Sequence, residues 1–267
     1  MLKFFKRLII ALFLLYIAAC SYMFFMQEDF IFHPKKLAAK HKINFPLEEE
    51  ELMLKIDEKT SISAILCHSQ QKKKKGLIFF LHGNSGNLTN QEQPAQFYTD
   101  MGYDFFSMDY RTFGKSTGEL IDEKQFYSDI TFAYKSMTKR YAEDSIIVVG
   151  YSIGTGSAAM ITASQHPSKL ILIAPYYSLI DMTQRRYPFI PSFLLNYKFE
   201  TNEFIKKIVQ PVLIVHGDKD DILPFDGSVM LSKLLNEKSQ FIALRGQNHN
   251  DFEFNKTYIS ALKNFLK

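Results

Sequence analysis

Short apolar runs separated by amphipathic stretches dominate the chain. Continuous apolar runs of this length are typical of parallel strands covered on both faces, and the stretches between them repeat with a helical period. An alternating pattern before them indicates an antiparallel strand pair. We therefore predict an α/β fold with a mostly parallel, doubly wound sheet and an antiparallel start. The expected strands are residues 51–56, 61–67, 76–81, 104–110, 146–149, 169–174, 212–215 and 240–244, and the expected helices are residues 91–101, 122–141 and three that end near residues 165, 236 and 267.

The first apolar run has the length of a membrane span. Residues 8–26 contain no charged side chain, and a helix of this length spans roughly 28 Å, close to the hydrocarbon thickness of a bilayer. We favour a retained transmembrane anchor over residues 1–27, because the apolar run continues past any plausible cleavage point. Residues 28–267 then form the single folded domain.

Two other interpretations of this segment stay open. The sequence IAAC at residues 17–20 resembles a bacterial lipobox, which would make Cys20 the lipidated first residue of a mature lipoprotein. An ordinary cleaved secretory signal is the third interpretation. Lys3, Lys6 and Arg7 place the N-terminus inside, although the lysines that follow the span nearly balance them. We expect the folded domain outside the cytoplasm.

The strand–helix alternation stops between residues 176 and 207. Such an insertion is either a short cap over an apolar pocket or a region of ordinary helical packing, and we favour the cap. An aromatic cap would suit an apolar or lipid-like acyl group. The aromatic residues of the insertion are Tyr176, Tyr177, Tyr187, Phe189, Phe193, Tyr197, Phe199 and Phe204.

Composition narrows the function further. The 267 residues are 46% hydrophobic and 22% charged, which fits one large-core domain plus a terminal segment. The net charge of +4 is too small to favour nucleic acid as a partner. The lysine run at residues 72–75 lies between two expected strands and is interpreted as a solvated hairpin loop. No His/Cys cluster has metal-ligand spacing, so we expect no metal and no cofactor.

Ser152 lies between an apolar run and a stretch of small residues, in the sequence Gly150-Tyr151-Ser152-Ile153-Gly154. A strand-to-helix turn this sharp lifts the serine hydroxyl above the sheet edge and leaves the Ile153 amide at a helix N-terminus. The same G-x-S-x-G spacing recurs around Ser116, but no helical pattern begins there. We therefore interpret Ser152 as a nucleophile and Ser116 as a loop serine.

A serine nucleophile needs a base in hydrogen-bond reach, and the base needs an oriented acid. His249 lies in a loop just past the last expected strand, whereas His166 ends a helix and His216 suits a structural role better. The loop at residues 217–224 offers three candidate acids, which are Asp218, Asp220 and Asp221.

Five motifs in register resemble those of α/β-hydrolase-fold serine hydrolases, over about residues 28–267. The likeness is strongest to the N-terminally membrane-anchored branch described as serine-aminopeptidase-like or α/β-hydrolase-domain proteins. The motifs are Phe80-Leu81-His82-Gly83-Asn84, the loop at residues 109–118, the serine turn at residues 150–154, His216-Gly217-Asp218-Lys219-Asp220 and His249-Asn250-Asp251.

By position, the resemblance implies that Ser152 is the nucleophile, Asp220 the acid and His249 the base. It also implies that the amides of Asn84 and Ile153 form the oxyanion hole. One departure is Thr112, which stands where the family loop usually has glycine, so we expect that loop to bend differently.

These observations predict a membrane-tethered serine hydrolase that acts through an acyl-enzyme on a carboxylic ester, a thioester or an amide. Its expected substrate is a small acyl ester or a lipid-like molecule, and its other partner is the membrane. Two alternatives stay open: a peptidase of the same fold, and a catalytically inactive hydrolase fold that serves as a membrane-tethered binding protein.

Overall fold

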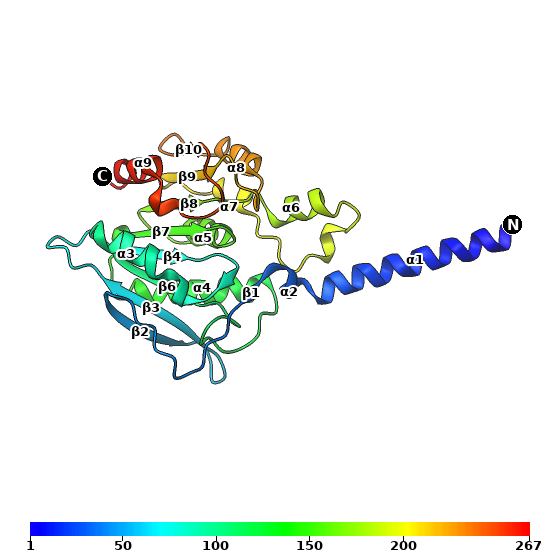
Figure 1. The fold of residues 1–267 in the computed structure, drawn as a ribbon, viewed down its shortest axis with the longest axis horizontal. Coiled ribbons are helices and arrows are strands. Elements are labelled where there is room, and N and C mark those ends of the chain that lie inside the picture. Colours follow the sequence, from blue (N-terminus) through cyan, green and yellow to red (C-terminus); the bar gives the residue numbers. More distant parts are fainter.

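An eight-stranded, mostly parallel sheet forms the centre of the computed structural model, which describes residues 1–267 (Figure 1). The strand order is β2-β3-β6-β4-β7-β8-β9-β10, with antiparallel pairing only at β2–β3 and β3–β6. The predicted fold class is therefore confirmed. The strands are β2 (Glu48–Lys55), β3 (Ser61–His68), β4 (Leu77–Leu81), β6 (Asp104–Met108), β7 (Ile146–Tyr151), β8 (Lys169–Ile173), β9 (Val212–Gly217) and β10 (Gln240–Leu244).

Helices cover both faces of this sheet, which gives the protein two apolar cores. One core joins the sheet to α4, α5 and α8, and the other joins it to α3 and α9. The continuous apolar runs of the parallel strands follow from this arrangement, because side chains on both faces of a strand are buried. The helices are α3 (Glu92–Asp100), α4 (Glu123–Met137), α5 (Gly154–Ser164), α8 (Phe225–Ser232) and α9 (Lys256–Phe265), with 3-10 turns at Leu88–Gln91, Glu143–Ser145 and Phe252–Phe254.

The lysine run at residues 72–75 is exposed, as predicted, but the hairpin interpretation is wrong. The run connects β3 to β4, and these strands are separated in the sheet by β6. Periodicity locates strands along a chain but does not give their order in the sheet. The helix expected to reach residue 236 also ends early, at Ser232.

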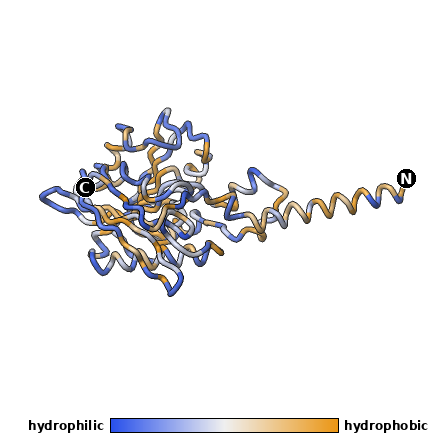
Figure 2. The backbone as a smooth tube through the Cα atoms, turned by 60° about the horizontal axis from the view of Figure 1, so that its bottom comes forward, coloured by the Kyte–Doolittle hydropathy of each residue, from blue (hydrophilic) through white to orange (hydrophobic).

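The N-terminal segment forms a single long helix that projects from the domain. This helix, α1 (Leu2–Phe25), has the length and apolar composition of a membrane span, and Cys20 is its one buried residue. Figure 2 shows this helix of mostly hydrophobic residues extending away from a body in which hydrophobic and hydrophilic residues are mixed. A second short helix, α2 (Gln27–Ile31), leads to β1 (His33–Pro34), which pairs with β5 (Ser85–Gly86).

The 176–207 insertion lies between β8 and β9 and has two unlike halves. It contains α6 (Leu179–Arg186), a 3-10 turn (Ser192–Leu194) and α7 (Thr201–Ile205). Tyr176, Tyr197 and Phe199 are buried in the core beside α4 and α5, whereas Phe189 and Phe193 are exposed. The insertion is thus part ordinary packing and part projecting loop.

Thr112 keeps the glycine-like bend of its loop, contrary to our expectation. Its φ is +68°, in the left-handed region that disfavours a β-branched side chain.

Thr112→Gly should therefore raise the free energy of unfolding by about 1 kcal/mol, because relief of the strain outweighs the extra entropy of glycine in the unfolded chain. Urea titration of both proteins measures the difference, and a destabilised glycine variant would show that the bend is not strained.

Candidate active site

The turn between β7 and α5 holds Ser152 in a strained conformation. Its φ is +54°, and its amide donates to the Ile173 carbonyl at 3.0 Å. The turn is possible because the flanking residues lack side chains: a Cβ on Gly154 would lie 2.2 Å from the Leu81 carbonyl oxygen, and one on Gly150 would lie 2.7 Å from the Ala158 Cβ. This geometry has the form of a nucleophile elbow.

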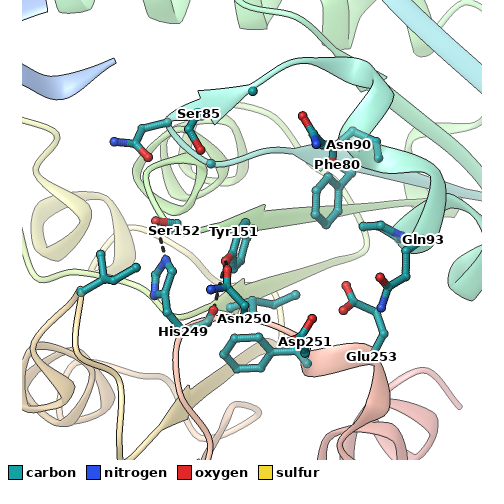
Figure 3. Close-up of a pocket in the computed structure, with 18 of the residues that line it drawn as sticks. Phe80, Ser85, Asn90, Gln93, Tyr151, Ser152, His249, Asn250, Asp251 and Glu253 are labelled. Carbon is teal, nitrogen blue, oxygen red and sulfur yellow. Dashed lines mark hydrogen bonds between the residues drawn. The ribbon is translucent and has the colours of Figure 1, made fainter. Parts of the chain in front are cut away.

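The structure brings Ser152, His249 and Asp220 into one hydrogen-bonded chain. His249 Nε2 lies 3.1 Å from Ser152 Oγ, and its Nδ1 lies 2.7 Å from Asp220 Oδ2. Figure 3 shows the first of these contacts at the edge of a pocket. Ser152 and His249 are buried, with 7% and 5% of their surfaces exposed. The three come from the ends of β7, β9 and β10, which meet at one edge of the sheet because these strands are parallel.

The Asp220 carboxylate has all its acceptor positions in use. Oδ1 accepts from the amides of Ile222 and Leu223, at 2.9 and 2.8 Å, and Oδ2 faces both His216 Nε2 and His249 Nδ1. Burial alone would raise the pKa of this carboxyl, but the hydrogen bonds from the two histidines and Leu223 outweigh burial and hold the pKa well below its usual range. Asp220 therefore stays ionised and orients His249.

The other candidate acids and the candidate base His166 lie apart from the hydrogen-bonded residues Ser152, His249 and Asp220. Asp218 and Asp221 are exposed, and Asp218 accepts a hydrogen bond from the Gly246 amide. His166 is exposed on the connection between α5 and β8. Burial and hydrogen bonding thus distinguish Asp220 from its neighbours, which spacing alone left equivalent.

Two further residues support this arrangement: His216, for which the sequence predicted a structural role, and Tyr151, for which it predicted none. His216 is fully buried and contacts Ser228 Oγ through Nδ1 at 2.6 Å, and its Nε2 lies 2.9 Å from Asp220 Oδ2, the oxygen that also faces His249. Tyr151 Oη donates to the His249 carbonyl at 3.0 Å and to Asn250 Oδ1 at 2.8 Å, which fixes the histidine loop. His216 belongs to the quoted His-Gly-Asp motif, whereas nothing in the sequence marks Tyr151.

The amides of Asn84 and Ile153 flank the serine and donate to no protein acceptor. Ile153 immediately precedes α5, where backbone N–H groups point outward and the helix dipole favours negative charge. The Asn84 side chain donates to the Ile31 carbonyl at 2.8 Å, and the Asn84 carbonyl accepts from the His33 amide at 2.7 Å. The loop after β4 is thus held by the segment that follows α1 and α2.

His82 lies beside this loop, is uncharged and supports the loop through a hydrogen bond. Burial lowers its pKa to about 4, and its Nδ1 contacts the Gly83 carbonyl at 2.7 Å. Tyr110 Oη donates to the His82 carbonyl at 2.9 Å. The loop that carries Asn84 is therefore fixed on both sides.

Ser116, the second G-x-S-x-G serine, is a structural residue. It is 1% exposed, accepts from the Ser63 amide and donates to the Asp109 carbonyl, each at 2.8 Å.

Ser116→Ala should lower the free energy of unfolding by about 1–3 kcal/mol, because the buried Ser63 amide loses its acceptor. Denaturant titration measures this loss; an unchanged midpoint would show that the two hydrogen bonds contribute nothing.

The pocket beside Ser152 is mixed in character: most of its lining residues are polar, and its exposed surface is divided between polar and apolar atoms, whereas we expected an apolar pocket. Its volume is about 480 Å³, and only five of its 19 lining residues are hydrophobic. None comes from residues 176–207, so the aromatic side chains of the insertion do not cover it. Figure 3 shows Asn90, Gln93 and Glu253 around this pocket. Sequence composition showed how aromatic the insertion is, but not which surface it covers.

Comparison with protein families and with individual proteins gives a consistent result. A family model described as serine aminopeptidase, S33, matches residues 72–200. The human α/β hydrolase domain-containing protein 17B is 30% identical over 199 residues, which cover 71% of this chain and 65% of that protein. The mouse protein 17C is 29% identical over 71% of this chain and 59% of its own length. The chain thus spans less than two thirds of the length of these relatives.

Solved structures share the fold at low sequence identity. An esterase of Pyrococcus furiosus, Pf2001, has a TM-score of 0.69 at 15% identity, covering 88% of this chain and 97% of the esterase chain. The α/β hydrolase GrgF from Penicillium sp. sh18 has a TM-score of 0.67 at 15% identity, covering 83% and 98% of the two chains. These likenesses concern the fold.

Proposed function

This chain belongs to the α/β-hydrolase-fold family of serine-hydrolase-like proteins, and we propose that it hydrolyses a carboxylic ester through an acyl-enzyme. The observation that carries the proposal is the continuous chain of contacts from Ser152 Oγ through His249 to Asp220. Thioesters and amides react by the same chemistry and are the further substrate classes.

In the proposed first step, Ser152 Oγ attacks the substrate carbonyl carbon while its proton passes to His249 Nε2. Asp220 holds the imidazole by accepting from Nδ1–H and stabilises the imidazolium that forms. The developing oxyanion would accept hydrogen bonds from the free amides of Asn84 and Ile153. When the tetrahedral intermediate collapses, the bond to the leaving group breaks, and this group takes the proton from Nε2.

Water completes the reaction by the same route. His249 removes a proton from water as its oxygen bonds to the acyl carbon, and it then returns a proton to Ser152 Oγ as the acyl–serine bond breaks. The protein ends in its starting protonation state, and the products are an acid and the leaving-group alcohol. No cofactor takes part in these steps.

The polar side chains that line this pocket support a substrate with a polar group near the scissile bond. Most of the side chains around Ser152 are polar, and the acidic Glu253 is among them. A long alkyl chain placed in such a pocket would desolvate these groups without replacing their hydrogen bonds. We accordingly favour short or polar acyl esters over long-chain ones.

Two experiments test this proposal on the full-length protein. A fluorophosphonate probe should label the protein at Ser152, located by peptide mapping, and p-nitrophenyl esters of graded chain length should be cleaved fastest when the acyl chain is short. Labelling of another residue, or no labelling, would contradict the proposed mechanism. Fastest cleavage of the longest chains would instead overturn the substrate preference and leave the mechanism in place.

We further propose that α1 anchors this domain in a membrane, as residues 1–27, with residues 28–267 forming the catalytic domain outside the cytoplasm. The apolar composition of α1 and its projection from the body support the anchor (Figure 2). A cleaved secretory signal and lipidation at Cys20 are the competing fates of this segment. Mass measurement of the protein isolated from membranes distinguishes all three, because each predicts a different N-terminal residue and mass.

A further inference from the structure

The outer part of the 176–207 insertion exposes a group of aromatic side chains. We call residues 187–195 the aromatic tip. Its side chains Tyr187, Phe189 and Phe193 are 40%, 58% and 80% exposed. Exposed phenylalanines this close together are unusual on a surface that faces only water, and they mark a contact surface.

The aromatic tip lies against α1, the proposed membrane anchor. Tyr16 Oη donates to the Phe189 carbonyl at 3.0 Å. At the base of the helix, the buried Gln27 side chain donates to the Leu194 carbonyl at 2.9 Å and accepts from the Asn196 amide at 2.8 Å. Figure 1 shows α6 and the following loop projecting from the body on the side where α1 leaves it.

These contacts set the depth of the tip along α1. Tyr16 lies nine residues before Phe25, the last residue of the helix. At a rise of 1.5 Å per residue, Phe189 therefore lies about 14 Å along the helix from its body end. A bilayer that surrounds the apolar length of α1 must also surround, or directly meet, a loop held at that position.

The composition of the tip suits this environment. Residues 187–195 contain no charged side chain, and Pro188 and Pro191 lack amides that would need partners in lipid. Exposed cationic side chains, Arg186 and Lys198, flank the tip on both sides. Cations at such boundaries are favourable where anionic lipid headgroups lie, and aromatic residues are enriched at the same level.

We propose that the aromatic tip is a second membrane-embedded element, whose partner is the lipid bilayer that α1 crosses. The inference rests on the membrane anchor proposed for α1. It explains why the aromatic residues of the insertion do not reach the pocket: one half packs in the core and the other enters lipid. The catalytic domain would then be held by two points, which fixes its orientation on the membrane surface.

The chain contains no tryptophan, so a single introduced tryptophan reports on one position without background. Three full-length variants are placed in phosphatidylcholine vesicles with acyl chains brominated near their middle: Phe193→Trp in the tip, Phe13→Trp in α1, and Phe254→Trp as control. Phe13 and Phe254 are 60% and 72% exposed, so all three substitutions lie outside the core. Phe254 ends the 3-10 turn just before α9, which lies at the opposite end of the molecule from α1 (Figure 1).

We expect brominated lipid to quench the tryptophan of Phe193→Trp and of Phe13→Trp about twofold or more, relative to unbrominated vesicles, because both are embedded. The Phe254→Trp emission should not change. Quenching at Phe13 without quenching at Phe193 would overturn the tip proposal while the anchor stands. Quenching at neither would overturn both. A blue-shifted but unquenched Phe193→Trp would show that protein, such as a second copy of the chain, covers the tip instead of lipid.

Discussion

Ser152→Ala should abolish labelling by a fluorophosphonate probe and lower kcat for a p-nitrophenyl ester by at least about 10⁴-fold. The variant keeps the free amides of Asn84 and Ile153, so it retains substrate binding and any polarisation of the carbonyl. It lacks the oxygen that forms the acyl-enzyme, and water must then attack the substrate directly. Single-turnover kinetics on the full-length protein measures the loss.

Ser116→Ala is the matched control for this experiment. It removes the same atom from the second G-x-S-x-G sequence of the same chain. Once corrected for folded fraction, its labelling rate should equal that of the unaltered protein, because Ser116 is buried against Ser63 and Asp109. Unchanged labelling of Ser152→Ala, with or without an effect of Ser116→Ala, would contradict the assignment of the nucleophile.

Asp220→Asn should lower kcat about 10⁴-fold with little change in KM. An asparagine fits the same space, but its NH₂ group cannot accept the hydrogen bonds that the carboxylate accepts on both sides. Whichever way the amide turns, donors face donors, either at the Ile222 and Leu223 amides or at the two histidines. His249 then loses the partner that holds its Nδ1 protonated and its Nε2 free to accept from Ser152.

Asp221→Asn makes the same chemical change one residue away, at an exposed position. It should leave kcat and KM for the ester within about twofold of the unaltered protein, as surface substitutions do. Equal losses in the two variants would point to a general effect of charge in this loop. A large loss in Asp221→Asn alone would move the acid to Asp221.

The sequence was sufficient for the fold because the central strands are buried on both faces. Runs such as residues 146–149 have no polar face, and amphipathic stretches such as residues 122–141 have one, so local pattern alone separates them. The motif order then placed Ser152, Asp220 and His249 at the ends of strands that meet at one edge. Local sequence and the rule that parallel strands end together were enough for Ser152 and His249, whereas the choice of Asp220 over Asp218 and Asp221 depended on the family resemblance.

Features that depend on contacts between segments distant in the sequence could not be predicted from local sequence pattern. His216 and His249 both contact Asp220 Oδ2, although 33 positions separate them in the chain. The polarity of the pocket depends on where the 176–207 insertion turns. Thr112 adopts a glycine-like backbone because its surroundings impose it, against its own preference. Local propensity carries no information on any of these.

The loop that carries Asn84 contacts residues 31–33, which follow α1 closely. These contacts connect the proposed membrane anchor to the site. Ile31 follows α1 by six residues, and its carbonyl accepts from the Asn84 side chain, while His33 pairs with Ser85. No flexible linker separates the anchor from the loop that offers one of the two free amides. Where α1 spans a bilayer, as we propose, a bilayer of different thickness changes the tilt of α1, and the change reaches Asn84 through the five residues, 26–30, that separate α1 from Ile31. On the proposed function, lipid composition would therefore alter turnover without contacting the substrate, and a form lacking residues 1–33 would lack the contacts that hold the Asn84 loop.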